Sequence, residues 1–467
     1  MDIHVRYLDQ EGKLWSQFLD LICLTDGKAD SIVLALKNII QMKGIPVHLI
    51  FGLGTDGAAV MTGKHNGVAK QLSNEWPWLL SVHCAAHRLA LACEDASEDV
   101  PYMATFRDHL EQLHLYFRNS ANRSASLKAA AEVLGVCELK VKQVKDTRWL
   151  SQHEAVKNLS KNISAVLGAL AEEVEIRKCP TAKGLYSFLA TYRFIAALHL
   201  QADVLPHLAR LSKPFQREDV MFLAIKEQVP VTLALIKGIK DSGGHQPGSH
   251  LARLNQSLDD PLGLGAFSIS AEQERGRRGQ DNTGGRQQYW QRFQSQVMDP
   301  YLDGLIAHLE RRFSEVGVLA AFGILGPQST TLPNDITHTH LRTLVGKFCS
   351  DVDFDTVLEE WASFKEQVVS GPLKNKTQLD IFSDLSSKYE EFGVLYPTIS
   401  QLAAIALTVP VKTNIRNRLQ GDHLAACMRI SINRPEVSDF PYQEALETFF
   451  RKPRKIHCSK NKCSLCG

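Results

Sequence analysis

One carboxylate, that of Asp56, stands in a turn rich in glycine and alanine, directly after a short apolar run at residues 48–53. Pro46 and the neighbouring glycines bound that run, which predicts a buried β-strand. In α/β proteins, ligands and metals bind in the crevice beyond the carboxyl ends of the strands. Asp56 is therefore a candidate catalytic or metal-binding acid. The alternative interpretation is that Asp56 only caps the helix that follows it.

Cysteine and histidine occur together at two places in the chain. Cys84 and His87 are three residues apart at the start of a predicted helix, the spacing of half a zinc site. No second pair follows at ligand spacing, so we expect a packed thiol and a hydrogen-bonded imidazole with a structural role. A second group of possible zinc ligands, framed by no predicted strand or helix, comprises His457, Cys458, Cys463 and Cys466.

A third candidate site is Arg148 beside Trp149. A guanidinium next to a large flat ring is the pair that stacks on unpaired nucleic-acid bases. The same tryptophan would also suit a purely structural role, as an anchor between a sheet and an inserted helical region. The residues themselves leave both interpretations open.

The composition is that of an ordinary globular protein: 467 residues, of which 44% are hydrophobic and 22% charged. This length predicts two to four domains. Six cations and no acid lie in residues 451–467, so the net charge of +2 leaves residues 1–450 at −4. Phosphate contacts supply most of the non-specific affinity for DNA, so any nucleic-acid role must come from local basic patches.

The cysteines and the hydropathy pattern predict the compartment. The ten cysteines are mostly isolated within apolar segments, which indicates reduced intracellular thiols. We find no secretory signal and no apolar run long enough to cross a bilayer. We therefore expect a nuclear or cytosolic protein with no membrane partner, and the basic tail favours the nucleus.

Hydrophobic periodicity predicts two strands at residues 3–8 and 14–23, then a helix capped by Asp30 and ended by Gly44. A short helix at 68–73 and a strand at 79–82 follow the Asp56 turn. Beyond residue 100 the pattern is helical, with a flexible loop at 241–288 and a connector at 325–353. The further helices are expected at 102–118, 124–134, 154–175, 185–211, 219–239, 290–313, 355–368, 379–392 and 397–408.

Taken in order, several motifs resemble the hAT superfamily of DNA transposases, and more closely its vertebrate, zinc-finger-associated group of domesticated copies. They are Gly-Thr-Asp-Gly-Ala-Ala-Val-Met-Thr-Gly-Lys-x-x-Gly at 54–67, Cys-x-x-His-Arg-Leu-Ala-Leu at 84–91, Thr-Arg-Trp-Leu-Ser at 147–151, and the region from Leu-Tyr-Pro at 395–397 to Asn433.

This resemblance implies an α/β fold: a ribonuclease-H-like mixed sheet interrupted by a large all-helical insertion, with a helical C-terminal dimerisation region. The implied domains are 1–98 for the first part of the core and 99–345 for the insertion. Residues 346–450 complete the core and include the dimerisation region, and 451–467 form a basic tail containing cysteines.

For the site, the resemblance makes Asp56 the second acid of an Asp-Asp-Glu magnesium site. The first acid would lie on a strand at or before residue 1. Asp2 is the only carboxylate near that point, and the residues around it do not match the family's acidic motif. The third acid belongs to a Glu-Arg-x-Phe-Ser block, but here Val411 runs directly into Lys412. We therefore expect an incomplete site, no bound cofactor and no enzymatic activity.

The resemblance further implies self-association, or pairing with related hAT-derived proteins, through an apolar stripe in the C-terminal region: Leu424, Cys427, Met428 and Ile430. The resemblance leaves DNA open as a second partner. Two alternatives remain: a fragment or isoform of an active DNA transposase, and a general protein-interaction scaffold.

Overall fold

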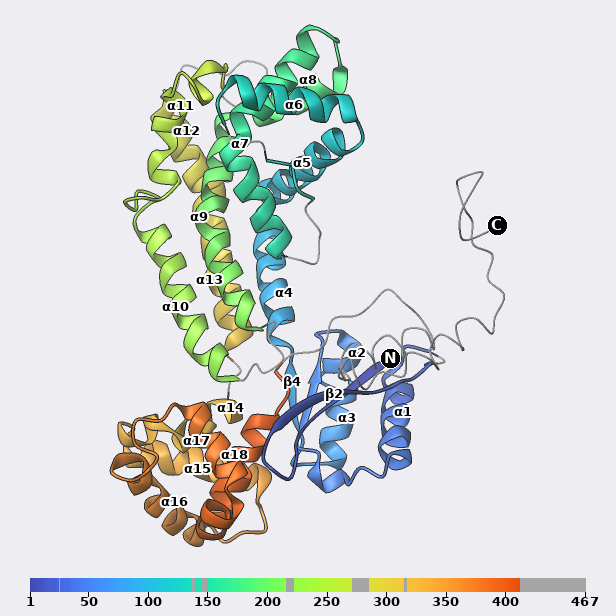
Figure 1. The fold of residues 1–467 in the computed structure, drawn as a ribbon, viewed down its shortest axis with the longest axis vertical. Coiled ribbons are helices and arrows are strands. Elements are labelled where there is room, and N and C mark those ends of the chain that lie inside the picture. The colour runs from blue at the N-terminus through green and yellow to red at the C-terminus, as the bar shows by residue number, and fades with distance from the viewer. Residues whose placement is uncertain are drawn as a thin grey trace, which may run out of the picture. The chain divides into compact units, whose positions relative to one another are not determined.

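The computed structural model describes residues 1–24, 26–136, 139–143, 149–215, 222–270, 285–314 and 317–411 (Figure 1). Of these, residues 1–6 and 15–24 belong to one compact unit, and residues 7–14 and 26–411 belong to a second. The described residues are mostly helical, and their strands form two small two-stranded sheets. This is an α/β architecture, as predicted. The single mixed sheet of a ribonuclease-H-like fold stays a prediction.

The first sheet is the predicted hairpin of β1 (Asp2–Leu8) and β2 (Leu14–Leu21). Its open end is closed by two hydrogen bonds between Met1 and Ile22, in which the backbone N–H of Ile22 donates to the carbonyl of Met1 at 2.8 Å. Inside the first unit, the ring of Phe18 is buried and meets the imidazole of His4 edge to face, with 5.6 Å between ring centroids.

The second sheet is a parallel pair, β3 (Gly52–Thr55) and β4 (Leu80–His83). The strand predicted at 48–53 therefore begins later than expected. Pro46 starts a 3-10 turn, η1 (Val47–Leu49), in which the N–H of Leu49 donates to the carbonyl of Pro46. The apolar run is thus divided between a turn and a strand, which periodicity alone does not distinguish in so short a segment.

Helices α1 (Ala29–Met42), α2 (Ala59–Thr62) and α3 (Val68–Glu75) accompany this sheet. The prediction that Asp30 caps α1 is wrong, because Lys28 occupies the cap and Asp30 lies within the first turn. The Asp30 carboxylate instead accepts a hydrogen bond from the side chain of Gln71 at 2.6 Å, which ties α1 to α3. The predicted stop is confirmed: Gly44 has φ +64°, a conformation that favours glycine.

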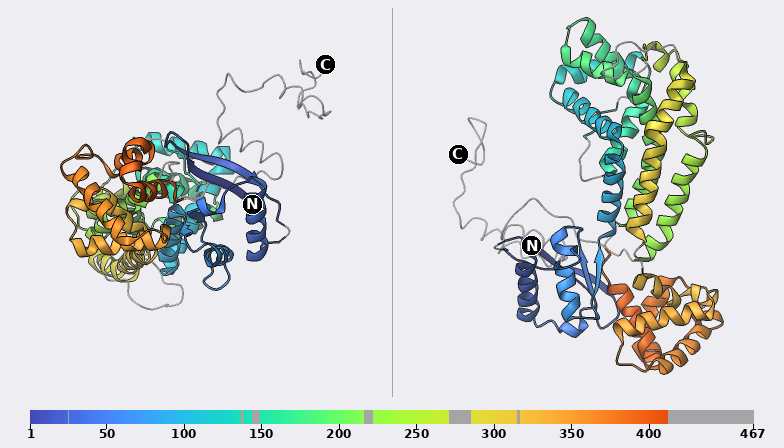
Figure 2. Two further views of the ribbon diagram at one scale, coloured as in Figure 1. Left: turned by 90° about the horizontal axis from the view of Figure 1, so that it is seen from below. Right: turned by 180° about the vertical axis from the view of Figure 1, so that it is seen from behind.

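A long helical region follows β4, and it is built around α9. Seventeen of the 24 residues of α9 are buried, as expected for a central helix that is apolar on every side. Helix α4 lies beside α13, and α7 beside α9 (Figure 1), and the view from behind shows the same bundle by its colours (Figure 2, right). The helices of this region are α4 (Ala85–Glu98), α5 (Pro101–Arg118), α6 (Ala121–Val133), α7 (Trp149–Glu175), α8 (Pro180–Leu189), α9 (Tyr192–Phe215), α10 (Phe222–Asp241), α11 (Leu254–Asp259), α12 (Arg286–Phe293) and α13 (Asp299–Phe313).

The helix predicted at 185–211 is broken into α8 and α9 by a contact from far along the chain. The N–H of Ser270 donates to the carbonyl of Ala190 at 3.0 Å, and the N–H of Tyr192 donates to the carbonyl of Ser270 at 3.1 Å. The hydroxyl of Thr191 then accepts from the N–H of Phe194, as a helix cap does. These bonds replace helical ones at the break.

The predicted loop at 241–288 contains more structure than expected. Residues 251–266 form two 3-10 turns, η2 (Leu251–Arg253) and η3 (Leu264–Ala266), on either side of α11. Four leucines of this stretch are buried, while Leu262 is exposed: the buried ones are Leu251, Leu254, Leu258 and Leu264. The carboxylate of Asp203 on α9 also accepts hydrogen bonds from the N–H groups of His250 and Leu251, at 2.7 and 2.9 Å. The polar composition of residues 241–288 predicted a loop, but residues 251–266 within it pack on α9.

The last described region is helical as well, and the predicted connector at 325–353 is largely α15. The remaining helices are α14 (Gly317–Ala321), α15 (Asn334–Phe348), α16 (Phe354–Val369), α17 (Gln378–Ser387) and α18 (Pro397–Thr408). The helix predicted at 397–408 is confirmed at both ends, because α18 begins at Pro397 and ends at Thr408. No described helix is both long and apolar enough to cross a membrane.

Candidate functional site

Asp56 lies at the carboxyl end of the parallel β3–β4 pair, as predicted. The strand register sets Thr55, the last residue of β3, beside His83, the last residue of β4. The N–H of Cys84 donates to the carbonyl of Thr55 at 2.9 Å, which holds the two strand ends together. One carboxylate oxygen of Asp56 accepts from the N–H of Ala58 at 3.2 Å. Asp56 thus stabilises the turn before α2 but is not the helix cap itself, which is Ala58.

Gly57 is required at this turn because two imidazole rings occupy the space of a side chain. A Cβ atom on Gly57 would lie 2.5 Å from Cε1 and 2.6 Å from Nε2 of His83, and 3.0 Å from Cδ2 of His87. The two rings are tilted by 49° with 5.3 Å between their centroids. The Asp56–Gly57 turn is therefore covered by imidazole.

The electrostatic setting keeps the His83 imidazole neutral near pH 7. Burial is the largest cause that lowers the pKa of His83 to about 4; the nearby charges of Arg88, His87 and Arg312 act in the same direction, and Asp56 opposes them. The Nε2 atom of His83 is buried and has no hydrogen-bond partner among the described residues. The side of the ring that carries Nε2 therefore packs against the Gly57 backbone without a hydrogen bond.

The segment that follows α18 reaches the same edge of the sheet. The ring of Pro410 packs against β3, where a Cβ on Gly52 would lie 2.6 Å from Cδ of Pro410 and one on Gly54 would lie 2.9 Å from its Cβ. The carbonyl of Val411 accepts from the N–H of Ala85, in the first turn of α4, at 3.0 Å. The junction at Val411 therefore lies beside the carboxyl ends of β3 and β4.

Helix α4 carries Cys84 and His87 at its start and is braced against α13. The guanidinium of Arg88 donates to the carbonyl of Arg312 at 2.9 Å. Further along α4, the Asp95 carboxylate pairs with Arg311 at 3.0 Å and with Arg312 at 2.5 Å. His308 bonds Asp99 at 2.7 Å. This brace fixes the direction in which α4 leaves the sheet.

Among the residues that the structure describes, this edge does not have the set of oxygen donors of a magnesium site. Magnesium prefers oxygen ligands in near-ideal octahedral geometry. Around the Asp56–Gly57 turn the structure places the imidazoles of His83 and His87, nitrogen donors that do not fit the ion, and the charge of Arg88 acts on His83. Across the described ranges, no group of three or more His, Cys, Asp or Glu side chains could hold a metal.

The structure describes some of the predicted site residues and not others. Cys84 is buried and precedes α4, and His87 is half-buried in its first turn. Trp149 begins α7. The remaining candidates lie outside the described residues: Arg148, Leu424, Cys427, Met428, Ile430, His457, Cys458, Cys463 and Cys466.

Three residues that the geometry brings to β3 and the turn after it were not predicted as part of the site: Gly57, His83 and Pro410. A glycine directly after the acid was a usable signal for a close approach. Nothing local in the sequence indicated that Pro410 would be the group packing on β3, since the two are more than 350 residues apart.

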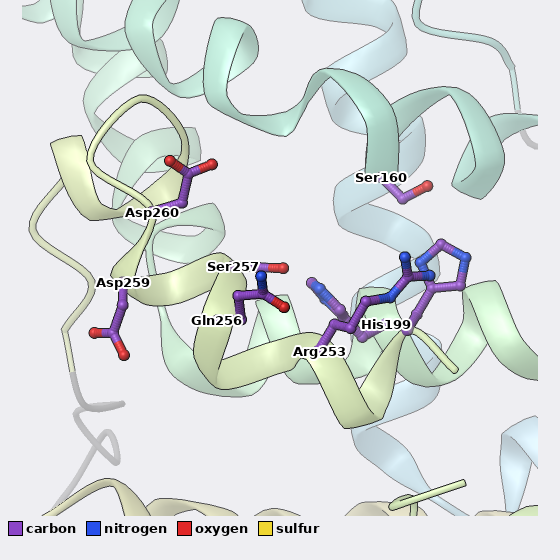
Figure 3. A pocket seen from close by; sticks show the side chains of 8 residues that line it. Ser160, His199, Arg253, Gln256, Ser257, Asp259 and Asp260 are labelled. Atoms are coloured by element: carbon purple, nitrogen blue, oxygen red, sulfur yellow. The ribbon is translucent and has the colours of Figure 1, made fainter. Parts of the chain in front are cut away.

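A polar pocket of about 750 Å³ lies elsewhere, among α7, α9, η2 and α11 (Figure 3). Asp259 and Asp260 lie towards one end, and Arg253 and His199 towards the other. Several of its polar groups already have protein partners. Asp259 pairs with Arg286 at 2.6 Å, the guanidinium of Arg253 donates to two backbone carbonyls, and the His199 ring bonds the carbonyl of Ile195. This arrangement offers no nucleophile paired with a base.

Comparison with known families gives one match over the first part of the chain. A family model described as ZMYM1/FAM200, RNase-like domain, matches residues 1–67. The matched range holds the β1–β2 hairpin, α1, β3 and the Asp56–Gly57 turn. A ribonuclease-like domain of this kind fits a domesticated transposase-like protein.

Proposed function

We propose that this chain is a catalytically inactive hAT transposase-like protein, of the zinc-finger-associated domesticated group, that acts by self-association and by contacting nucleic acid in the nucleus. One observation carries the proposal. At the carboxyl end of β3 and β4, Asp56 is accompanied by imidazoles and by the Val411 junction, where the resemblance expects a third acid.

The chemistry explains why this edge is inactive. Two-metal phosphoryl transfer holds two cations about 3.5–4 Å apart, so that they stabilise both the attacking and the leaving oxygens. Several carboxylates are needed to balance the charge of such a pair. Asp56 with two imidazole rings does not supply them, and the charge of Arg88, which acts on His83, disfavours a second cation nearby.

We expect no DNA cleavage or strand transfer by this chain with Mg²⁺ or Mn²⁺, and no difference between the wild type and Asp56→Asn. The measurement is a gel assay on labelled hairpin and linear DNA, with an active nuclease as the positive control for the substrate. Metal-dependent cleavage that disappears in Asp56→Asn would instead favour the alternative of an active transposase fragment or isoform.

Self-association is the second part of the proposal. If residues 424–430 form the helix that the resemblance implies, the stripe of Leu424, Cys427, Met428 and Ile430 is too apolar to stay exposed, so a second copy of the chain is the natural partner. The resemblance also assigns dimerisation to this region. The absent Glu-containing block removes chain that would support the contact, so the dimer should be of limited stability.

We expect a dimer that Met428→Asp shifts towards monomer, because the substitution places a charge within the apolar contact. Light scattering over a range of protein concentrations measures the mass, and 52.1 kDa marks the monomer. Val394→Asp is the matched control, since that valine is 68% exposed on the described surface. A monodisperse monomer at high concentration, or equal effects of both variants, would refute self-association through the stripe.

A further inference from the structure

The polar pocket of Figure 3 has a volume of about 750 Å³, which is the size of a small-molecule site. Three parts of the helical region line it: Ser160 from α7, His199 from α9, and residues 250–260. The carboxylate of Asp203 on α9 accepts two N–H groups at the start of η2, at 2.7 and 2.9 Å. Hydrogen bonds to a charged group therefore hold the wall formed by η2 and α11 against α9.

His199 presents a hydrogen-bond acceptor to this pocket. The residue is 8% exposed, and its Nδ1 atom lies 2.8 Å from the carbonyl oxygen of Ile195. A carbonyl can only accept, so Nδ1 carries the proton of this bond. Burial is the largest cause that lowers the pKa of His199, so the ring is neutral at pH 7. The lone pair of Nε2 is then on the side of the ring that lines the pocket, and no described residue bonds to it.

The hydroxyl of Ser160 has the same polarity as His199 Nε2. It donates its hydrogen to the carbonyl of Lys157 at 3.1 Å. A hydroxyl has one donor and two lone pairs, so its oxygen remains an acceptor for a ligand. Two acceptors from different helices, α7 and α9, therefore face the same pocket.

Arg253 adds a cation near these acceptors, and its charge acts on His199. Its Nε and Nη2 groups donate to the carbonyls of Ser249 and Gly248, both at 3.2 Å, which holds the guanidinium in place. An ammonium group is disfavoured beside this cation, and a phosphate or carboxylate would meet the two lone pairs. A hydroxyl group suits both, because it donates to a lone pair and accepts from the guanidinium.

The other end of the pocket carries Asp259 and Asp260 (Figure 3). Asp259 pairs with Arg286 at 2.6 Å, and one oxygen of Asp260 accepts from the N–H of Leu262 at 3.1 Å. Each carboxylate keeps further acceptor capacity, because an ionised carboxylate has about four lone-pair sites. This end therefore also requires donors. The two aspartates balance the charges of Arg253 and Arg286, so the pocket does not require a charged ligand.

We propose that this pocket binds an uncharged, saturated ring that carries several hydroxyl groups, as a sugar does. Hydroxyls at one end donate to His199 and Ser160 and accept from Arg253, and hydroxyls at the other end donate to the aspartates. Between the two ends, α11 contributes Gln256 and Ser257, whose side chains both donate and accept. A free monosaccharide and the ribose of a nucleoside share this chemistry.

The test is saturation-transfer NMR on the full chain, with D-glucose, uridine and 2′-deoxyuridine as the probes. We expect glucose to bind with a Kd on the order of 1 mM, because a ligand of this size gains little affinity per atom from polar contacts. Uridine that binds where 2′-deoxyuridine does not would assign the ribose of a nucleoside as the source of the ring. Glucose that binds without either nucleoside would assign a free sugar.

Two variants locate the binding in the pocket. Ser160→Ala removes one acceptor and should raise Kd about three- to tenfold, the effect of one neutral hydrogen bond. Asp260→Asn keeps an oxygen for the N–H of Leu262 but loses the charge, and should raise Kd about tenfold. Ser187→Ala is the matched control: this exposed serine on α8 also donates to a carbonyl of its own helix, at 2.8 Å, and Kd should not change. Melting temperatures equal to that of the wild type show that each variant is folded.

The outcomes that overturn the proposal are distinct. Glycine or inorganic phosphate that displaces glucose at equal concentration overturns the assignment of an uncharged ligand. Equal effects of Ser160→Ala and Ser187→Ala in folded protein overturn the location. Absence of saturation transfer to all three probes overturns the pocket as a site for hydroxylated rings. None of these results depends on self-association or on nucleic-acid contact, so the proposed function stands or fails separately.

Discussion

Acidification from pH 7 to pH 5 is expected to destabilise the second unit strongly, because six of its histidines are held in the neutral form. Burial is the largest cause of the lowered pKa in each case. These residues are His83, His109, His153, His199, His207 and His340. The unfolded chain binds protons on all six near the ordinary histidine pKa of about 6.5.

The sign follows from proton uptake. Below about pH 6.5 the unfolded state binds protons that the folded state does not yet bind, so the free energy of unfolding falls as the pH falls. For His83 the loss extends down to about pH 4, its folded pKa. One pKa unit corresponds to about 1.4 kcal/mol, and solvent screening of this half-buried ring reduces the effect of His83 to roughly 1–2 kcal/mol.

Urea unfolding, followed by tryptophan fluorescence at pH 7, 6 and 5, measures the effect. We expect the urea concentration at the unfolding midpoint to fall as the pH falls. Replacing His83 by Gln removes one of the titrating rings, so the variant should lose less stability over this range than the wild type. His65→Gln, at an exposed position, is the control and should match the wild type. A midpoint that is constant from pH 7 to pH 5 would contradict the burial of these imidazoles.

The second large effect is expected from adding methyl groups to β3. In Gly52→Ala and Gly54→Ala the new Cβ atoms would lie 2.6 Å and 2.9 Å from atoms of the Pro410 ring. A proline ring next to backbone cannot rotate away, so the segment must move off the strand. Overpacking of this kind costs about 1–3 kcal/mol per site. We expect the double variant to be destabilised by more than either single one.

Chemical denaturation gives the stability, and hydrogen exchange of residues 405–411 reports whether the segment leaves β3. Gly184→Ala is the matched control, because nothing lies within 4 Å of its added Cβ in the interior of α8. Alanine in a helix interior stabilises by roughly 0.5–1 kcal/mol relative to glycine. If the β3 variants behaved like Gly184→Ala, Pro410 would not be packed against the strand.

Much of the architecture could be predicted from local patterns. The hairpin of β1 and β2, the start of α4 at Cys84, the stop at Gly44 and both ends of α18 follow from alternation, helical periodicity and turn residues. The errors at 185–211 and at 241–288 occurred where a distant segment altered the local preference. The break at Ala190 depends on Ser270, and residues 251–266 are ordered by burial of leucines and by the carboxylate of Asp203.

The residues of the candidate site divide in the same way, between features set by neighbouring residues and features set by packing with distant ones. The sequence alone determined that a carboxylate follows a strand, that a glycine follows it, and that Cys84 precedes a helix, because these depend on neighbouring residues. Only the tertiary structure decided that His83 and His87 cover Gly57 and that Pro410 packs on Gly52 and Gly54. It also decided that Arg88 is braced by Arg312. Local patterns set which face of an element is apolar, but the segment that covers that face is chosen by packing between residues far apart in the chain.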